Sequence, residues 1–379
     1  MVAAGMAAII CVLMILFPAE ALDSARKGVN IWLDTVLPAL LPFFICANFM
    51  AAMGVPRLIG RAFDGLFQKI FNVSGISAFV FFISTSSGYP MGAMLIGKLA
   101  RKGEIKREEA KVMLAFCTTS GPLFMLGAVG VGMLGSPKAG YIIAFSHYLG
   151  AMLNGLLWSK LKPIRSYSHI RNQNKAIPKV GSRERLSKVF TRSILSSLET
   201  VGIICCYLIL FTMISDFLML SGIFQWSEKD IWGIGASGIL EMTVGCHGVS
   251  LSKMVSVPLK IALSTFFISF GGLSIMAQSM SLLSGTGIGP FYYLRVKITH
   301  GLIGAAISLA LGTLLMPYAG AEAVSTFSDG KLLTGTFSGY LSLWIFSLKG
   351  IVLLILAFAF TVIAGEICRC YNSGKGKKD

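Results

Sequence analysis

The chain has 379 residues, of which 55% are hydrophobic and 13% are charged, and its net charge is +16. A soluble domain carries about 25% charged residues, so this composition excludes an ordinary soluble protein. The basic excess does not indicate nucleic-acid binding, because Lys and Arg lie between long apolar segments and nucleic-acid-binding motifs are absent. We therefore predict an all-α polytopic membrane protein.

An apolar segment opens the chain, and no small-residue cleavage site follows it. We therefore expect a first span rather than a removed signal peptide. A transmembrane helix needs about 20 apolar residues. By that criterion we expect about eight transmembrane helices, at residues 3–22, 31–53, 110–134, 139–160, 194–220, 257–283, 291–316 and 340–365.

Two further apolar segments, 76–98 and 231–252, are interrupted at their middles. The first contains Ser-Gly-Tyr-Pro at 87–90, and the second contains Glu241 followed by Thr, Gly and His. Gly, Pro and hydroxyl-bearing residues at these points favour a turn over a continuous helix. We predict two re-entrant helical hairpins, whose irregular backbone must be satisfied by protein or water at membrane depth.

Basic residues are concentrated in the loops that this arrangement places on one side of the membrane. Cytoplasmic loops are enriched in Lys and Arg, so both termini are expected on the cytoplasmic side. The acidic pairs Glu228/Asp230 and Glu322/Asp329 then lie on the opposite side. The expected organisation is an N-terminal transmembrane half (1–160), a basic cytoplasmic linker (161–193), a C-terminal transmembrane half (194–365) and a cytoplasmic tail (366–379).

The two halves repeat the same order of elements: span, broken hairpin, broken span, and a span that begins near a histidine. The broken spans are interrupted at 118–122 and 269–274, and the histidines are His147 and His300. The hairpins have opposite orientations, which makes this an inverted repeat. Interrupted helices at corresponding places in two halves indicate a transporter binding site. Chance similarity among Gly- and Ser-rich spans is the alternative explanation.

The four interruptions form the candidate substrate site. Half-helix N-termini present unpaired N–H groups and the positive end of a dipole, which suits an anionic or carbonyl-bearing solute. Hydroxyl groups add donors and acceptors, although a Ser or Thr can equally bond its own helix. The candidate substrate-binding residues are Ser86, Ser87, Gly88, Tyr89, Thr118, Thr119, Ser120, Gly121, Glu241, Thr243, Gly245, Ser269 and Gly271.

Glu241 is the sharpest single candidate, because an ionised carboxylate inside a membrane is costly and is usually functional. A helix end near water is the alternative for this residue. Histidine can also carry a proton. The candidates for carrying a coupling proton or ion are Glu241, His247, His147 and His300.

His300 follows Arg295 and Lys297, so a position at the membrane interface is an alternative for it. No Arg or Lys is expected near the middle of any span. An anion would therefore be held by helix N-termini and hydroxyl groups. The sequence contains no metal-ligand spacing and no catalytic cluster.

Three motifs carry a resemblance to a known family: Leu-Pro-Ala-Leu-Leu-Pro-Phe-Phe-Ile at 37–45, Ser-Gly-Tyr-Pro-Met-Gly-Ala at 87–93 and Phe-Cys-Thr-Thr-Ser-Gly-Pro-Leu-Phe at 116–124. With them the chain resembles the sporulation integral membrane protein YlbJ family, which carries the nucleoside-recognition Gate domain. The resemblance covers residues 30–365. It implies a fold related to concentrative nucleoside transporters, a spore-forming bacterium, and transport of dipicolinate across the outer forespore membrane.

In the nucleoside transporters, the hairpin tips and unwound spans bind substrate and cation. By motif position, the resemblance therefore implies roles for Ser86, Ser87, Gly88, Thr119, Ser120, Glu241, Thr243 and Gly271.

Transport of a small polar or anionic solute, without enzymatic activity, is the predicted function. The alternatives are a nucleoside-type transporter, a membrane-embedded enzyme that uses Glu241 as acid or base, and a signalling or assembly scaffold. No cofactor is expected beyond a coupling proton or sodium ion. The expected partners are a small-molecule substrate and the lipid bilayer, with a homo-oligomer as a further candidate and nucleic acid excluded.

Overall fold

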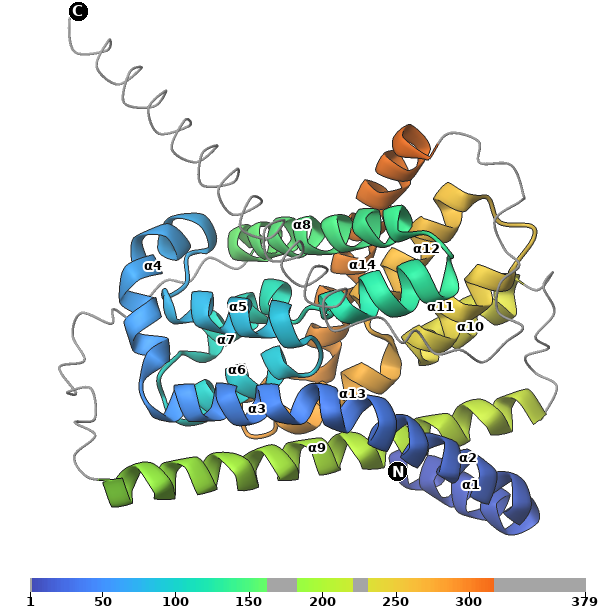
Figure 1. Cartoon of the computed structure of the whole chain (residues 1–379), viewed down its shortest axis with the longest axis horizontal. Helices are drawn as coiled ribbons and strands as arrows, with labels where there is room; N and C mark the ends of the chain where they lie inside the picture. Colours follow the sequence, from blue (N-terminus) through green and yellow to red (C-terminus); the bar gives the residue numbers. More distant parts are fainter. Residues whose placement is uncertain (1, 162–182, 221–230, 317–379) are drawn as a thin grey trace, which may run out of the picture. The chain divides into compact units, whose positions relative to one another are not determined.

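The computed structural model describes residues 2–161, 183–220 and 231–316, and these form helices without any strand (Figure 1). The first helices are α1 (Val2–Leu16), α2 (Pro18–Ile31), the π-helical η1 (Trp32–Val36), α3 (Leu37–Ala52) and α4 (Val55–Phe71). Next come α5 (Ile76–Ser87), α6 (Met91–Arg101), α7 (Arg107–Cys117), the π-helical η2 (Leu123–Met133) and α8 (Pro137–Leu161). The last are α9 (Arg183–Leu220), α10 (Ile231–Leu240), α11 (Met242–Leu251), α12 (Val257–Phe270), α13 (Gly272–Leu282) and α14 (Pro290–Leu315).

The prediction of one span at 3–22 is wrong, because the helix breaks at Phe17. The segments Ala8–Leu16 and Pro18–Ile31 meet at 113°. Pro18 is the first residue of α2, where its fixed φ and missing N–H are tolerated, whereas inside a helix they would break it. Helix α2 then continues through η1 into α3, so the helix expected at 31–53 begins well before residue 31.

Residues 54–75, expected as a loop, contain the helix α4. It begins after Gly54, whose φ of 84° lies in the left-handed region, and ends before Asn72, whose φ is 55°. Arg57, Arg61 and Lys69 alternate with apolar residues along α4, as in an amphipathic helix. Helix α9 likewise begins at Arg183, inside the expected linker. The expected span 340–365 and the tail 366–379 lie outside the described residues.

Both interrupted segments form two short helices joined by a tight turn, α5 with α6 and α10 with α11 (Figure 1). Glycines let the helices of each pair approach. A Cβ atom added at Gly92 would lie 3.3 Å from Ser84 Cβ, and one added at Gly245 would lie 2.2 Å from Gly238 Cα. We call these pairs the first and second hairpins; their re-entrant placement in a membrane stays a prediction.

The two broken spans are interrupted where the sequence predicts. Residues 118–121 separate α7 from η2, and Gly271 alone separates α12 from α13. Gly271 and Gly272 have φ values of 84° and 71°, which favour glycine. The sharp turn between α12 and α13 therefore follows from a local sequence signal.

Three helices of the described residues are long and apolar enough to cross a membrane: Leu186–Leu218, Val257–Leu282 and Pro290–Leu315. The number rises to five if each of two bent helix pairs counts as one span. These helices support a helical protein that spans a membrane. They do not confirm the predicted number of about eight spans.

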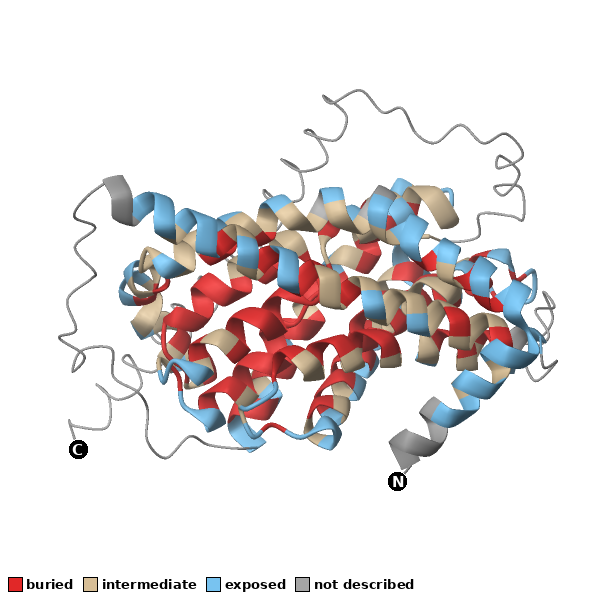
Figure 2. Cartoon of the chain, turned by 90° about the horizontal axis from the view of Figure 1, so that it is seen from below, coloured by how far each residue is buried: buried red, intermediate tan, exposed pale blue. Residues whose placement is uncertain are grey.

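Buried residues gather in the interior, above all in α5, α6 and α7, while the surrounding helices present exposed residues (Figure 2). Many exposed residues on these outer helices are apolar. Ile15 of α1 is 78% exposed and Leu195 of α9 is 61% exposed. Lipid tails are as apolar as such side chains, so this surface suits contact with a bilayer.

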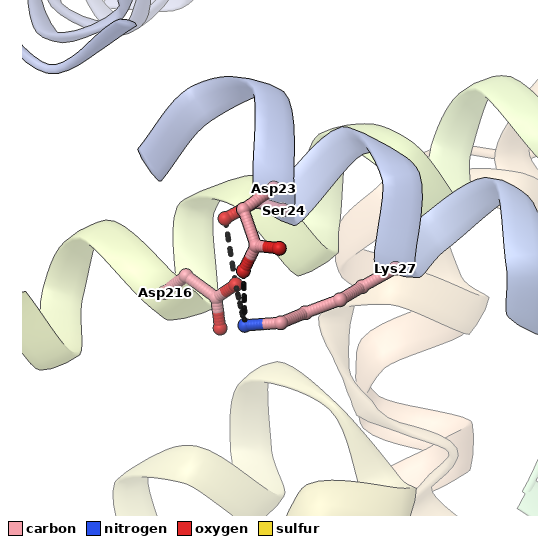
Figure 3. A network of polar contacts seen from close by, with 4 residues as sticks. All are labelled: Asp23, Ser24, Lys27 and Asp216. Carbon is pink, nitrogen blue, oxygen red and sulfur yellow. Dashed lines mark hydrogen bonds and ion pairs between the residues drawn. The ribbon is translucent and has the colours of Figure 1, made fainter. Parts of the chain in front are cut away.

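Helix α9 runs alongside α2 and α3 (Figure 1). A polar cluster joins α2 to α9 (Figure 3). Ser24 Oγ donates a hydrogen bond to Asp216 Oδ2 at 2.6 Å. Lys27 Nζ lies 3.0 Å from Asp23 Oδ2 and 3.4 Å from Asp216 Oδ2. We call Asp23, Ser24, Lys27 and Asp216 the α2–α9 cluster; its one cation faces two carboxylates.

Candidate functional site

The turn of the first hairpin packs against the break of the first broken span. Gly88 has a φ of 85°, and a Cβ atom added there would lie 2.6 Å from the backbone nitrogen of Gly121. Gly121 is itself close to Ser87, because its own added Cβ would lie 3.2 Å from the Ser87 carbonyl oxygen. No larger residue fits at Gly88 without moving this contact, so the glycine fixes the turn on the break.

The second half repeats this arrangement. The turn of the second hairpin, at residues 240–242, packs against the Gly271–Gly272 break. A Cβ atom added at Gly272 would lie 3.0 Å from the Leu240 carbonyl oxygen and 3.1 Å from the Met242 nitrogen. In each half, therefore, a hairpin turn packs against the break of a broken span.

His147 of α8 joins the two breaks. Its Nε2 atom accepts a hydrogen bond from the backbone N–H of Ser120 at 2.9 Å. Its Nδ1 atom lies 2.8 Å from Ser269 Oγ, at the end of α12. The imidazole is fully buried. A single ring thus spans from the first break to the second.

Helices α8 and α14 approach closely beside this ring. A Cβ atom added at Gly150 would lie 3.1 Å from Gly304 Cα. The approach brings the His147 and His300 rings to 4.8 Å between centroids. His300 Nε2 lies 2.9 Å from the His147 carbonyl oxygen. His300 is only 1% exposed, so its side chain lies in the interior of the described helices.

Lys297 of α14 completes the centre. The side chain is 1% exposed. Its Nζ donates to Tyr89 Oη at 2.6 Å and to the Thr118 carbonyl oxygen at 2.9 Å. It also lies 3.5 Å from His300 Nδ1 and 4.6 Å from the centroid of the Tyr89 ring. The Tyr89 hydroxyl in turn reaches the carbonyl oxygens of Ile268 and Ser269, at 3.2 and 3.3 Å.

We call Tyr89, Thr118, His147, Ser269, Lys297 and His300 the central junction. Among the described residues, no carboxylate forms an ion pair with Lys297. A buried charge without a counter-charge is strongly unfavourable. Residues that carry such a charge inside a membrane are usually functional. The central junction therefore offers a lysine amine without a described acidic partner as a candidate binding site for an anion.

Lys297 was not among the predicted site residues, although its side chain is buried among the described helices. A usable signal was the helical spacing of Tyr293, Lys297, His300 and Gly304, which places these residues on one face. All four are buried, whereas Arg295, two residues from Lys297, is exposed. Helical periodicity therefore distinguishes the buried Lys297 from the exposed Arg295, whereas distance from the end of the helix does not.

One protein of known sequence is similar across most of the chain. It is the sporulation integral membrane protein YlbJ of Bacillus subtilis (strain 168), which is 29% identical over 330 residues, covering 78% of each chain. The chain is therefore similar to a YlbJ protein over most of its length. Its apolar helices and this integral membrane relative together identify a membrane protein. No protein-family model matches the chain, and no solved structure matches it.

Several candidate hydroxyl groups bond their own helices. Ser86 Oγ donates to the Phe82 carbonyl at 2.9 Å, and Ser87 Oγ donates to the Ile83 carbonyl at 2.8 Å. Thr118 Oγ1 donates within α7 in the same way. The hydroxyl groups of Ser86, Ser87 and Thr118 therefore bond their own helices, which is the alternative to substrate binding. Thr119 differs, because its Oγ1 is buried without a hydrogen-bond partner among the described groups.

Glu241 is a helix cap. Its Oε2 accepts from the Val244 N–H at 2.9 Å, at the start of α11, and its Oε1 accepts from Thr243 Oγ1 at 3.2 Å. Its geometry is therefore that of a residue at the end of a helix. Gly245 packs on the neighbouring helix of its hairpin. His247 is exposed on α11, and the contacts of the central junction do not include it.

Proposed function

We propose that this protein carries a small anionic solute across a membrane through the central junction. The observation that carries the proposal is the buried ammonium group of Lys297, which has hydroxyl, carbonyl and imidazole partners but no described acidic partner. Such a group attracts an anion into the centre of the protein. Because it contacts the first hairpin and the first broken helix, and Tyr89 connects it to the second broken helix, the bound anion would sit between the two halves of the chain.

The helix ends around the junction also favour the binding of an anion. Helices α6, η2 and α13 all begin at the interruptions, and none of their first turns is capped by a side chain. The start of α11 differs, because the Glu241 carboxylate caps it. Uncapped helix N-termini carry partial positive charge and bind anions. Three uncapped starts and one lysine give the centre a consistently positive character.

The family resemblance supplies a specific solute and place for this proposal: dipicolinate, carried across the outer forespore membrane during sporulation. Dipicolinate is a planar dianion, which suits a positive junction lined by backbone groups. The inverted repeat, the re-entrant hairpins and the cytoplasmic termini belong to the same proposal. A nucleoside is the alternative solute, and it would not require the Lys297 charge.

Uptake by the purified protein tests the proposal. Labelled dipicolinate and, separately, labelled uridine are offered to proteoliposomes, with protein-free liposomes as the background. We expect saturable dipicolinate uptake that unlabelled dipicolinate suppresses and uridine does not. Uridine uptake alone would replace the anion by a nucleoside. Uptake of neither solute would remove the transport proposal for both.

A further inference from the structure

The hydrogen-bond partners of His147 fix its protonation. Its Nε2 faces the Ser120 N–H, which can only donate, so Nε2 must offer a lone pair. In the neutral ring the proton then resides on Nδ1, which donates to Ser269 Oγ. A second proton on His147 would set two N–H groups against each other at 2.9 Å. His147 is therefore a neutral bridge between the two breaks, which argues against the predicted role as a proton carrier.

His300 has the opposite arrangement. Its Nε2 faces the His147 carbonyl oxygen, which can only accept, so Nε2 carries the proton. The lone pair of the neutral ring is then on Nδ1, which faces Lys297 Nζ at 3.5 Å. His300 can gain a proton only at Nδ1. The ammonium group of Lys297 opposes that proton as long as nothing negative lies beside the pair.

Among the residues that the structure describes, the neighbours of the pair provide no compensating negative charge. Along α14 itself, Arg295 is exposed. Cys117 of α7 directs its thiol to the Ser77 carbonyl. On α12, the group that faces the Lys297–His300 pair is the Ser269 hydroxyl. The titratable side chains around the pair are otherwise neutral at physiological pH; they are Tyr89, His147, Tyr148 and Tyr293.

Lys297 already has three acceptors for its three N–H groups: Tyr89 Oη, the Thr118 carbonyl and His300 Nδ1. A carboxylate that enters the junction can replace His300 Nδ1 as one of these acceptors. Nδ1 is then free to take up a proton and donate it to the same carboxylate. Lys297 and His300 together hold one positive charge before the anion binds and two afterwards. Groups that interact this strongly gain and lose protons as a pair.

We propose that Lys297 and His300 bind a carboxylate group of a small dicarboxylate together, and that the site takes up one proton from solution as the anion binds. This inference rests on the anion transport proposed above. The charge count favours a dicarboxylate, because its two negative charges balance Lys297 and protonated His300. A monocarboxylate leaves one positive charge unbalanced in a buried site. The solute would therefore cross the membrane together with a proton.

Calorimetry on the full chain in detergent tests the proton count. Pyridine-2,6-dicarboxylate is titrated at mildly alkaline pH into the protein in two buffers of different ionisation enthalpy. The difference between the observed enthalpies gives the number of protons taken up, and we expect about one per bound anion. The affinity should accordingly fall about tenfold per unit of rising pH. Binding of the anion without proton uptake would overturn the inference while leaving anion transport intact.

The variant His300→Gln separates His300 from other proton acceptors. The glutamine oxygen can accept from Lys297, but the amide cannot gain a proton in this pH range. We expect the variant to bind the anion with no proton uptake and with little dependence on pH. The control His247→Gln, which removes an exposed histidine, should take up the same number of protons as the wild type.

Unchanged proton uptake by His300→Gln would assign the proton elsewhere and overturn the inference. If this variant does not fold, the wild-type proton count still decides. No binding of the dicarboxylate to the wild type would remove anion transport itself, which is a different failure from binding without a proton.

Discussion

Lys27 and Lys297 lie in two polar clusters with different contents. In the α2–α9 cluster, Lys27 is 55% exposed and faces the carboxylates of Asp23 and Asp216 (Figure 3). In the central junction, Lys297 is 1% exposed and faces a hydroxyl, a carbonyl and an imidazole. The first lysine has its counter-charges within the protein, and the second has none among the described residues. A cluster whose cation has acidic partners can join helices, whereas one whose cation has none is suited to bind a charged ligand.

Replacing each lysine in turn by methionine tests this comparison most strongly. We expect Lys297→Met to lower dipicolinate uptake by roughly thirtyfold or more, because losing one partner of a buried charged contact typically costs about 2–5 kcal/mol. Lys27→Met should change uptake less than about twofold, because exposed ion pairs contribute little. Initial uptake rates in proteoliposomes at matched protein content measure both effects.

Stability provides the control for that experiment. An apolar side chain of similar volume often stabilises a protein when it replaces a buried charge. Lys297→Met should therefore melt in detergent at the wild-type temperature or above it. A large fall in melting temperature together with lost uptake would make Lys297 a structural residue, and the contrast with Lys27 would then fail.

Tyr89 sharpens the comparison, because its hydroxyl is both an acceptor for Lys297 and a donor to the second break. We expect Tyr89→Phe to weaken dipicolinate uptake about tenfold, since a hydrogen bond to a charged group contributes about 1.5–3 kcal/mol. The effect should appear in the half-saturating concentration. Tyr292→Phe is the matched control: its hydroxyl donates to the Lys111 carbonyl, between the same helix α14 and α7. Equal effects of the two substitutions would contradict a specific role for Tyr89.

Glu241 tests whether a charge predicted as functional is needed at all. Gln retains an oxygen that can accept from the Val244 N–H, while it removes the negative charge. As a helix cap, the residue should tolerate Glu241→Gln with uptake within about threefold of the wild type. Uptake that is lost while the melting temperature is kept would instead restore Glu241 as a coupling residue.

The interruptions of the helices were predictable from sequence because their causes are local. Pro90, Gly121 and Gly271 each mark a turn or a break within a few residues. The two π-helical segments were not predicted, since a run of apolar residues gives no sign of where the helical hydrogen-bond pattern changes. The break at Phe17 was missed although Pro18 marks it. The amphipathic α4 carried a sequence signal, but its charges also fit a loop.

The contents of the site were less predictable, because they depend on which face of each helix meets its neighbours. Arg295 and Lys297 are two residues apart, yet one is exposed and the other is buried. Glu241 drew attention as the acid in an apolar segment, although a backbone N–H three residues later is enough to account for it. Long-range partners such as Tyr89 and Lys297 were visible only once the two halves were placed together.

The smallest expected effect concerns Ser24 of the α2–α9 cluster. Ser24→Ala removes the 2.6 Å hydrogen bond between α2 and Asp216 of α9. We expect a loss of about 1 kcal/mol in stability, measured as a slightly lower melting temperature in detergent, and unchanged dipicolinate uptake. Ser308→Ala is the control, because that buried hydroxyl bonds only the Ala305 carbonyl of its own helix. If the α2–α9 cluster only joins helices, Ser24→Ala lowers stability more than Ser308→Ala and affects transport no more. A selective loss of uptake in Ser24→Ala would mean that the α2–α9 cluster takes part in transport, and the presence of acidic partners for the lysine would then not distinguish the two sites.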